Sequence, residues 1–262
     1  MATSAAKRLG ARSWGASGLT VATLLLLLAL AAPACGGGEE SGRSDTARGT
    51  TTEEAGGAID PTDCSAKVDH PLVPLSSISL KVFEGSEPDP DTGETIETRA
   101  ELRVLKKPAV VGGFRVAVVE VREYEDGELV ERTLDYYTQC GDRSVWYVGE
   151  KVDDYQDGEL VGHEGQWQAG KGGAKPGLFM PAEPKVGLTF EQERAPGVAE
   201  DRSTVVAVDV DVRTSAGEFT DCLKTEDFAP LDKITEFKFY CPEVGLVREE
   251  QESVRLDLVR YR

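Results

Sequence analysis

The chain is poor in the side chains that carry most enzyme chemistry. Its 262 residues include two histidines, His70 and His163, and no Cys-x-x-Cys pair, so a thiolate metal site is disfavoured. It also lacks a G-x-S-x-G elbow, an H-E-x-x-H motif, a P-loop and a dinucleotide-binding fingerprint. We therefore expect no catalytic residue, no metal ion and no cofactor.

The sequence also lacks helical periodicity, because no apolar stripe with helical spacing persists beyond two turns. Parallel α/β folds need crossover helices, so they are disfavoured. Apolar and polar residues alternate instead from Val206 to Val212 and from Val254 to Leu258, the pattern of half-buried strands. Asp126-Gly127 and Asp157-Gly158 lie between strand-like runs and predict two-residue type I′ hairpins.

These patterns predict a single all-β domain. We expect a strongly curved antiparallel meander sheet or an open barrel, with a Pro/Gly-rich loop covering one end. The expected strands are residues 77–84, 94–106, 114–125, 128–138, 144–150, 151–156, 159–167, 187–194, 203–214, 218–226, 234–241, 245–250 and 253–260.

Long apolar runs are absent after the first 35 residues. The one that is present, Gly18 to Ala32, follows the basic residues Lys7, Arg8 and Arg12, which is the layout of a secretory signal peptide. It is shorter than the ~20 apolar residues of a spanning helix, and Pro33 would end it. A cleaved leader is favoured over a transmembrane anchor.

Two cleavage sites compete at the end of this leader. Ala32-Pro33-Ala34 suits ordinary signal peptidase, whereas Ala32-Pro33-Ala34-Cys35 followed by three glycines resembles the lipobox of bacterial lipoproteins, with Ala32 where Leu is more usual. In that family the cysteine is acylated and becomes the anchored N-terminus. The chain has five cysteines, and an exported protein seldom leaves one unpaired, so lipidation of Cys35 is the favoured interpretation.

The expected organisation is therefore a signal peptide over residues 1–34, a lipidated cysteine and flexible tether over 35–61, and one β domain over 62–262. The formal net charge is −18, and it becomes −21 without the leader, which has three basic residues and no acidic one. Such a charge opposes nucleic acid and favours cations or basic partners. We expect a location in the cell envelope, held to a membrane through Cys35.

The four remaining cysteines can form two disulfides. Cys222 and Cys241 stand symmetrically about a polar turn between Leu231 and Asp232, so a hairpin centred there would place them opposite each other. That leaves Cys64 to pair with Cys140. Of the three pairings that four cysteines allow, we favour this one.

The least regular stretch runs from Trp167 to Gly187. Its three prolines and five glycines argue against regular strand pairing, yet its apolar residues must pack on something. It either fills one end of the sheet as core, which is favoured, or forms a rim over a cavity. The residues of this possible ligand or packing cluster are Trp146, His163, Trp167, Phe179 and Met180.

His163 and Glu164 also raise the question of an imidazole–carboxylate pair. On a strand these neighbours would point to opposite faces, so we favour a polar surface position for both.

Several segments between residues 68 and 250 carry a resemblance to known proteins. They are His70–Leu75, Val145–Glu150, HEGQW at His163–Trp167, KPGLFMPAEPKVG at Lys175–Gly187, Ala195–Asp201, Phe219–Thr225 and PEVGLV at Pro242–Val247. On these segments the chain resembles a family of uncharacterised bacterial exported proteins and lipoproteins, for which no activity is known. Members of that family often carry Ala at position 241 and Asp at position 140, which implies that the two disulfides are particular to this chain.

The favoured function is a membrane-anchored envelope lipoprotein with a non-enzymatic binding or interaction domain, whose partner is an unidentified envelope protein. One alternative is a carrier of a lipid or other apolar ligand, by analogy with envelope carriers of the lipoprotein-localisation type. That carrier would need an apolar cavity of ~300 Å³ or more beside Trp167 and Met180. A second alternative is a hydrolase that uses a pair of carboxyl groups with raised pKa values in a cleft.

Overall fold

The computed structural model describes residues 54–55, 58–89, 92–252 and 254–262. The expected leader, Cys35 and most of the expected tether lie outside these residues. The described chain is all-β, as predicted, and its strands form one large antiparallel sheet that is not closed. Within the described residues no helix is both long and apolar enough to cross a membrane.

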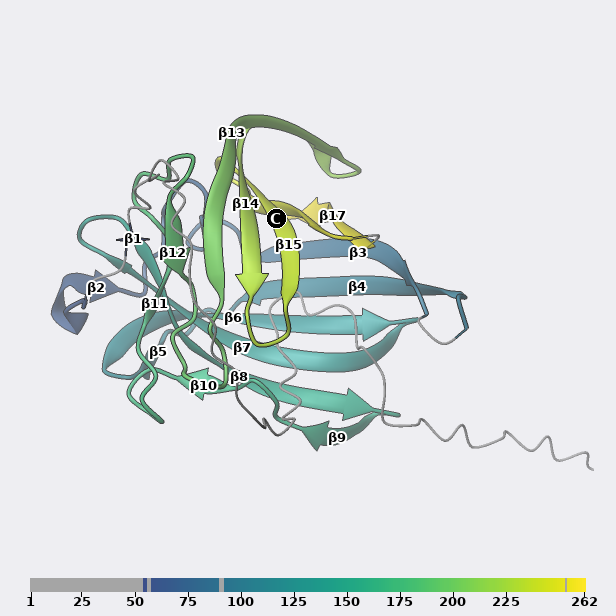
Figure 1. Ribbon diagram of the computed structural model, residues 1–262, viewed down its shortest axis with the longest axis horizontal. Helices are drawn as coiled ribbons and strands as arrows, with labels where there is room; N and C mark the ends of the chain where they lie inside the picture. Colours follow the sequence, from purple (N-terminus) through teal and green to yellow (C-terminus); the bar gives the residue numbers. More distant parts are fainter. Residues whose placement is uncertain (1–53, 56–57, 90–91, 253) are drawn as a thin grey trace, which may run out of the picture.

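The first half of the sheet is a meander of long strands, which lie side by side in Figure 1. Each of the long strands pairs antiparallel with the next in the order β3, β4, β6, β7, β8. The elements of this half are β2 (Cys64–Ser65), β3 (Leu80–Pro88), β4 (Thr95–Val104), β5 (Ala109–Val111), β6 (Phe114–Glu125), β7 (Glu128–Cys140), β8 (Val145–Gln156) and β9 (Glu159–Gly162).

The second half continues the sheet from the other edge of β3. There β17 pairs with β3, and β16, β15, β14, β13 and β12 follow in order. The remaining strands are β1 (Glu54–Ala55), β10 (Trp167–Gln168), β11 (Gly177–Met180), β12 (Thr189–Glu191), β13 (Arg202–Thr214), β14 (Gly217–Ala229), β15 (Ile234–Cys241), β16 (Gly245–Gln251) and β17 (Val254–Tyr261). Strand β1 pairs with β12 in parallel, whereas β10 and β11 both pair antiparallel with β8.

The sheet curves so strongly that its second half lies across its first. In Figure 1, β13, β14 and β15 cross in front of β6 and β7 at a steep angle. The main core lies between the two layers, where Val121 of β6 and Tyr137 of β7 belong to the same buried cluster as Val205 of β13, Leu223 of β14 and Tyr240 of β15. Burial of this apolar surface holds the two halves together.

The two Asp-Gly turns have the predicted geometry. Asp126 and Gly127 have φ values of 48° and 85°, and Asp157 and Gly158 have φ values of 53° and 79°. Positive φ at both central residues defines a type I′ turn, whose twist matches that of the flanking strands. The turns fix the β6–β7 and β8–β9 hairpins.

Both predicted disulfides are present. Cys64 bonds to Cys140, its direct cross-strand partner between β2 and β7, and Cys222 bonds to Cys241. The β14–β15 ladder has the expected register, with Leu223 opposite Tyr240. Disulfides persist in oxidising compartments, so the domain has an extracytoplasmic location.

Several details of the strand prediction are wrong, including β2 and β5, which were not expected, and β3, which was expected at 77–84. The strands expected at 144–150 and 151–156 are one strand, β8, and the strand expected at 159–167 ends at Gly162. The Trp167–Gly187 stretch contains two short strands although regular pairing was not expected there. Its glycines permit this, because a Cβ at Gly177 would lie 1.9 Å from the carbonyl oxygen of Gln192, so only glycine lets β11 approach that segment.

Candidate binding pocket

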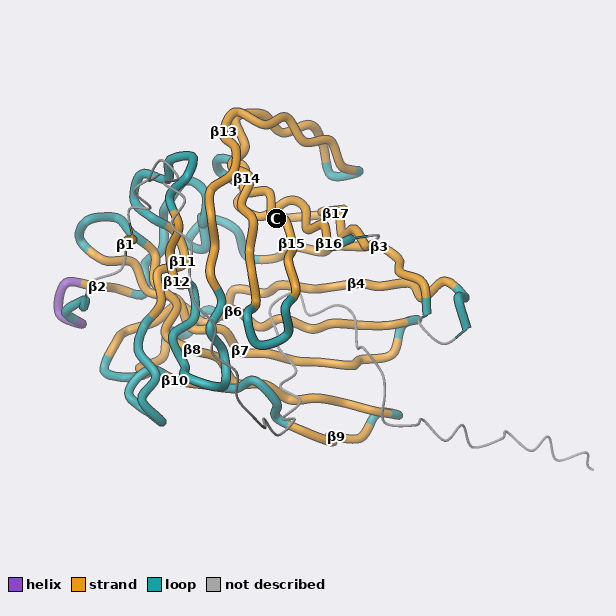
Figure 2. Tube along the Cα trace, viewed as in Figure 1, coloured by secondary structure: helices purple, strands orange, loops and turns teal. Residues whose placement is uncertain are grey.

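The loops gather at one end of the sheet, around β10, β11 and β12, as Figure 2 shows. This end holds a pocket of about 350 Å³ that opens to the surface, a volume at the lower end of the range for small-molecule sites. Its buried wall is formed by Glu150, Trp167, Ala174 and Ala195, and its exposed rim includes Val198. The other lining residues are Gln166, Gln168, Lys171, Gly172 and Pro196.

A bulge in β8 decides which side chains face this end of the core. Tyr136 and Tyr137 of β7 stand opposite Gly149 and Tyr147, so one extra residue is inserted in β8. The bulge brings Tyr147 and Glu150, three residues apart, into contact. Gly149 has a φ of 129°, and a Cβ there would lie 2.3 Å from the carbonyl oxygen of Trp167, so the bulge depends on glycine.

Glu150 is the acidic residue among those that line the pocket; it is 2% exposed and forms the pocket floor. It stands opposite Asp135 of β7 on one side and Trp167 of β10 on the other. The Tyr147 hydroxyl lies 3.2 Å from Oε2 of Glu150 and 3.2 Å from Oδ1 of Asp135. Since a tyrosine has a single hydroxyl proton, both contacts are hydrogen bonds only when one of the two carboxyl groups is protonated and donates.

Burial explains which protonation state each of these carboxyl groups favours. Burial raises the pKa of Glu150 well above its usual range, and the nearby Glu193, Asp135 and Glu131 raise it further. Burial raises the pKa of Asp135 to about 7, while the nearby hydroxyl of Thr133, the hydrogen bond from Tyr147 and the charge of Lys238 oppose the rise. Glu150 is therefore the protonated member of the Asp135–Tyr147–Glu150 chain at neutral pH.

A third buried carboxyl group, Glu193, lies just after β12. Burial raises its pKa well above the usual range, and the charge of Asp201 adds to the effect. The indole of Trp167 lowers it in part, although neither Oε2 of Glu193 nor Nε1 of Trp167 has a hydrogen bond of good geometry within the described residues. Three acidic residues, Glu150 at the pocket floor and Asp135 and Glu193 behind it, thus lie in the low-dielectric interior.

The buried cation nearest to this group serves other acids. Lys238 of β15 lies 2.7 Å from Oε1 of Glu236 and 3.5 Å from Oδ2 of Asp227. Burial alone would lower the pKa of Lys238, but Glu236 and Asp227 raise it well above its usual value. Lys238 therefore stays charged; its ion pairs are with Glu236 and Asp227, its charge also lowers the pKa of Asp135 and Glu193, and it is not among the groups that act on Glu150.

The predicted cluster divides between the core and the surface. Trp146, Phe179 and Met180 are buried core residues that do not line the pocket, whereas Trp167 is buried and does. Phe179 packs edge-on against Tyr137 with ring centroids 4.8 Å apart. Trp146, Phe179 and Met180 therefore pack in the core, as the favoured interpretation has it, whereas the pocket lies beside Trp167.

His163 belongs to a different part of the surface. It follows the end of β9, is exposed, and its Nδ1 lies 2.6 Å from the carbonyl oxygen of Val152 and 3.1 Å from Oδ1 of Asp153. Glu164 does not pair with it, because the backbone N–H of Glu164 donates to Asp154. The polar surface interpretation is confirmed, although neither residue is on a strand: His163 directly follows β9 and Glu164 lies in the turn after it.

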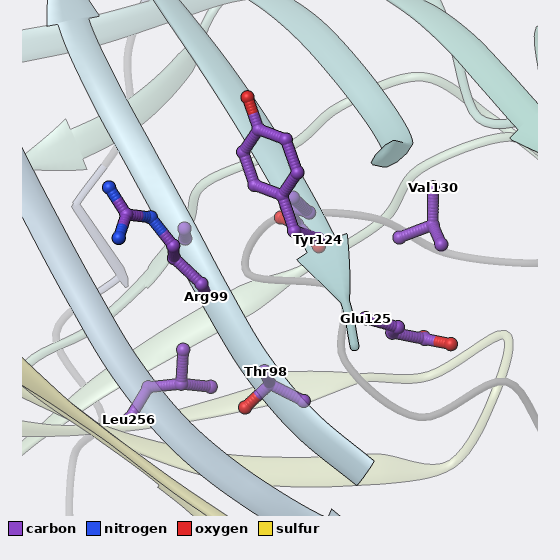
Figure 3. Close-up of a pocket in the computed structure, with 8 residues that line it drawn as sticks. Thr98, Arg99, Tyr124, Glu125, Val130 and Leu256 are labelled. Carbon is purple, nitrogen blue, oxygen red and sulfur yellow. The ribbon is translucent and has the colours of Figure 1, made fainter. Parts of the chain in front are cut away.

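A second hollow lies between β4 and β6 at the opposite end of the sheet. Figure 3 shows Arg99 and Tyr124 beside it, and its volume is about 10 Å³, room for about one water molecule. In the part of the chain that the structure describes, no three His, Cys, Asp or Glu side chains are placed to hold a metal ion. The pocket at Glu150 is therefore the candidate functional site.

Sequence reasoning missed Asp135, Glu150 and Glu193. A signal was present for the first two, because Glu150 ends the strongly apolar run Val145–Gly149 and Asp135 interrupts Leu134–Tyr137. An acidic residue inside such a run is a candidate buried carboxyl group. Glu193 had no comparable signal, since its burial depends on the path of the chain after β12.

Comparison with known proteins finds no matching family model, no matching characterised protein and no matching solved structure. The interpretation of the pocket therefore depends on its own geometry and chemistry.

Proposed function

We propose that the protein is a membrane-anchored, non-enzymatic binding protein of the cell envelope, and that its ligand is a small molecule held in the Glu150 pocket. One observation carries this proposal: a pocket of about 350 Å³ at the loop-rich end of the sheet has a buried carboxyl group as its floor. A few polar groups converging in a concave site are the usual pattern of small-molecule recognition.

The anchor is proposed from the sequence. The two disulfides occupy Cys64, Cys140, Cys222 and Cys241, so Cys35 is left over in a chain with an odd number of cysteines. A leftover cysteine after an apolar leader suits acylation better than a free thiol. Two acyl chains would hold the domain stably at a membrane.

The lining of the pocket favours a polar or amphipathic ligand over a purely apolar one. Met180 is fully buried and does not line the pocket, while Glu150, Gln166 and Lys171 do. These polar groups would lose hydrogen bonds to water on contact with an aliphatic chain. A lipid carrier is thus the weaker proposal.

A carboxyl-dependent hydrolase is also weaker. Such enzymes place two carboxyl groups on either side of the bond that breaks. Glu150 has a raised pKa, as a general acid requires, but Asp135 and Glu193 do not line the pocket. One accessible carboxyl group is suited to binding.

Native mass spectrometry of the protein purified from its host membrane tests the proposed function. We expect the wild-type protein to carry two acyl chains at Cys35 and a bound species of one defined mass. Val198→Trp at the pocket rim should remove the bound species by filling the pocket. Val186→Trp is the control, because Val186 is 60% exposed and does not line the pocket.

Two results would contradict the proposal. An acyl-free Cys35 would remove the anchor, and equal occupancy in the Val198→Trp and Val186→Trp variants would remove the pocket as the binding site.

A further inference from the structure

We propose that the ligand of the Glu150 pocket is a small organic cation with an amine or quaternary ammonium group, neutralised by Glu150. This inference rests on the proposed binding function and adds the chemical class of the ligand. It follows from three features of the site: the free oxygen of Glu150, the lack of a Lys or Arg ion pair to the buried carboxyl groups among the described residues, and an indole in the pocket wall.

The first feature is the position of the Glu150 carboxyl group. Its Oε2 atom contacts the Tyr147 hydroxyl, and its Oε1 atom has no hydrogen-bond partner among the described residues. Glu150 nevertheless lines the pocket. Oε1 is therefore the acceptor that this residue can offer to a ligand, with the geometry of Oε2 already fixed by Tyr147.

The second feature is uncompensated acidity. Within the described chain, no Lys or Arg nitrogen lies within 4 Å of a carboxyl oxygen of Asp135, Glu150 or Glu193, and Lys238 pairs with Asp227 and Glu236 instead. Oδ2 of Asp135 and Oε2 of Glu193 are buried and have no hydrogen-bond partner there. A cationic ligand would supply the charge that the protein does not.

The third feature is the wall of the pocket. Trp167 is buried beside Glu150, and an indole attracts an ammonium group more strongly than any other side-chain ring.

Lys171 is the one cationic residue that lines the pocket, but it is exposed and its Nζ donates to Oε1 of Gln168 at 2.6 Å. It can stay at the rim while a ligand enters. The negative charge of the whole chain, −18, attracts cations toward the pocket.

Binding of a cation should displace a proton from Glu150. The groups that act on Glu150 are Glu193, Asp135 and Glu131, which favour its protonated form, and Tyr147, whose hydroxyl favours the charged form. Lys238 acts on Asp135 and Glu193. An ammonium group beside Glu150 favours its carboxylate, so binding releases a proton and affinity rises with pH.

Isothermal titration calorimetry with a matched pair of probes tests this inference on the full disulfide-bonded domain. Choline is the cation, and 3,3-dimethyl-1-butanol is its neutral isostere. We expect choline to bind at least tenfold more tightly than the isostere. We also expect its affinity to rise by up to tenfold per pH unit between about pH 6 and about pH 8, with proton release seen as a buffer-dependent heat.

Two substitutions complete the test. Glu150→Gln keeps the shape and removes the charge, so choline affinity should fall at least tenfold and lose its pH dependence. Glu159→Gln is the control, because Glu159 is exposed on β9 and does not line the pocket. Urea unfolding of both variants shows that each is folded.

The outcomes separate the ligand class from the binding function. Equal binding of the isostere, or an affinity that falls as pH rises, would overturn the cationic ligand and leave a pocket that binds a hydrogen-bond acceptor. Failure of choline to bind would also overturn it, while the Val198→Trp comparison decides independently whether the pocket binds anything.

Discussion

Buried acidic residues dominate the chemistry of this protein at the residue scale. Burial, with the nearby Asp154, raises the pKa of Glu131 to about 8, and burial raises that of Asp135 to about 7. In the unfolded chain such groups ionise near pH 4. Between about pH 4 and about pH 7 the folded state therefore binds more protons than the unfolded state. The free energy of unfolding is greatest near the acidic end of this range and decreases as the pH rises.

Glu131→Gln isolates one contribution to this decrease. From about pH 5 to about pH 8 the free energy of unfolding should decrease less in the variant than in the wild-type protein. The difference in slope should be on the order of 1 kcal/mol per pH unit, because the variant lacks the one proton that Glu131 holds in the folded state. Urea unfolding at the two pH values measures it, with Glu159→Gln as the exposed control. A wild-type protein that is equally stable at both pH values would contradict the assignment.

Gly149 is the residue on which the shape of the pocket floor depends. Its φ of 129° and the 2.3 Å approach of a Cβ to the carbonyl oxygen of Trp167 make Gly149→Ala both strained and sterically blocked. We expect a loss of at least about 2 kcal/mol in the free energy of unfolding, with disruption of β10.

Gly158→Ala is the matched control for Gly149→Ala, because Gly158 also has a positive φ but no atom within 4 Å of the Cβ position. It should cost about 1 kcal/mol. Equal losses in the two variants, measured by chemical unfolding, would show that the close approach of β10 does not matter.

At the scale of the elements, the sequence predicts strands well wherever alternation and turns agree. Residues 114–125 and 234–241 match β6 and β15 to the residue, because Asp-Gly or polar turns bound strands with a clear pattern. The short β11 was missed, since both its pairing with β8 and the close approach of Gly177 to Gln192 are tertiary contacts. The candidate site was missed for a related reason: a bulge at Gly149, invisible in the pattern, decides that Glu150 contacts Tyr147.

The two disulfides connect elements over different lengths of chain. Cys64 and Cys140 are 76 residues apart in sequence and Cys222 and Cys241 are 19 apart. Chain entropy alone predicts losses of about 4.5 and about 3 kcal/mol when the bridges are removed. Urea unfolding of the double variants Cys64→Ser/Cys140→Ser and Cys222→Ser/Cys241→Ser should follow that order, and the reverse order would contradict a loop-entropy origin.

At the scale of the whole molecule, the loops gather at one end of the curved sheet (Figure 2), and residues from this end line the pocket. If Cys35 is acylated, Cys35→Ser should move the protein from the membrane fraction to the soluble fraction without changing its unfolding midpoint. Cell fractionation followed by thermal unfolding measures both. A variant that stays in the membrane fraction would contradict the proposed anchor.

The central proposal is that the carboxyl group of Glu150 meets the ligand at the pocket floor. Infrared difference spectroscopy at neutral pH tests it most directly, because a protonated carboxylic acid has a carbonyl band that a carboxylate lacks. Addition of choline should remove that band in the wild-type protein and leave the Glu150→Gln spectrum unchanged. An unaltered band in a wild-type protein that binds choline, or the same loss of the band in Glu150→Gln, would contradict the proposal.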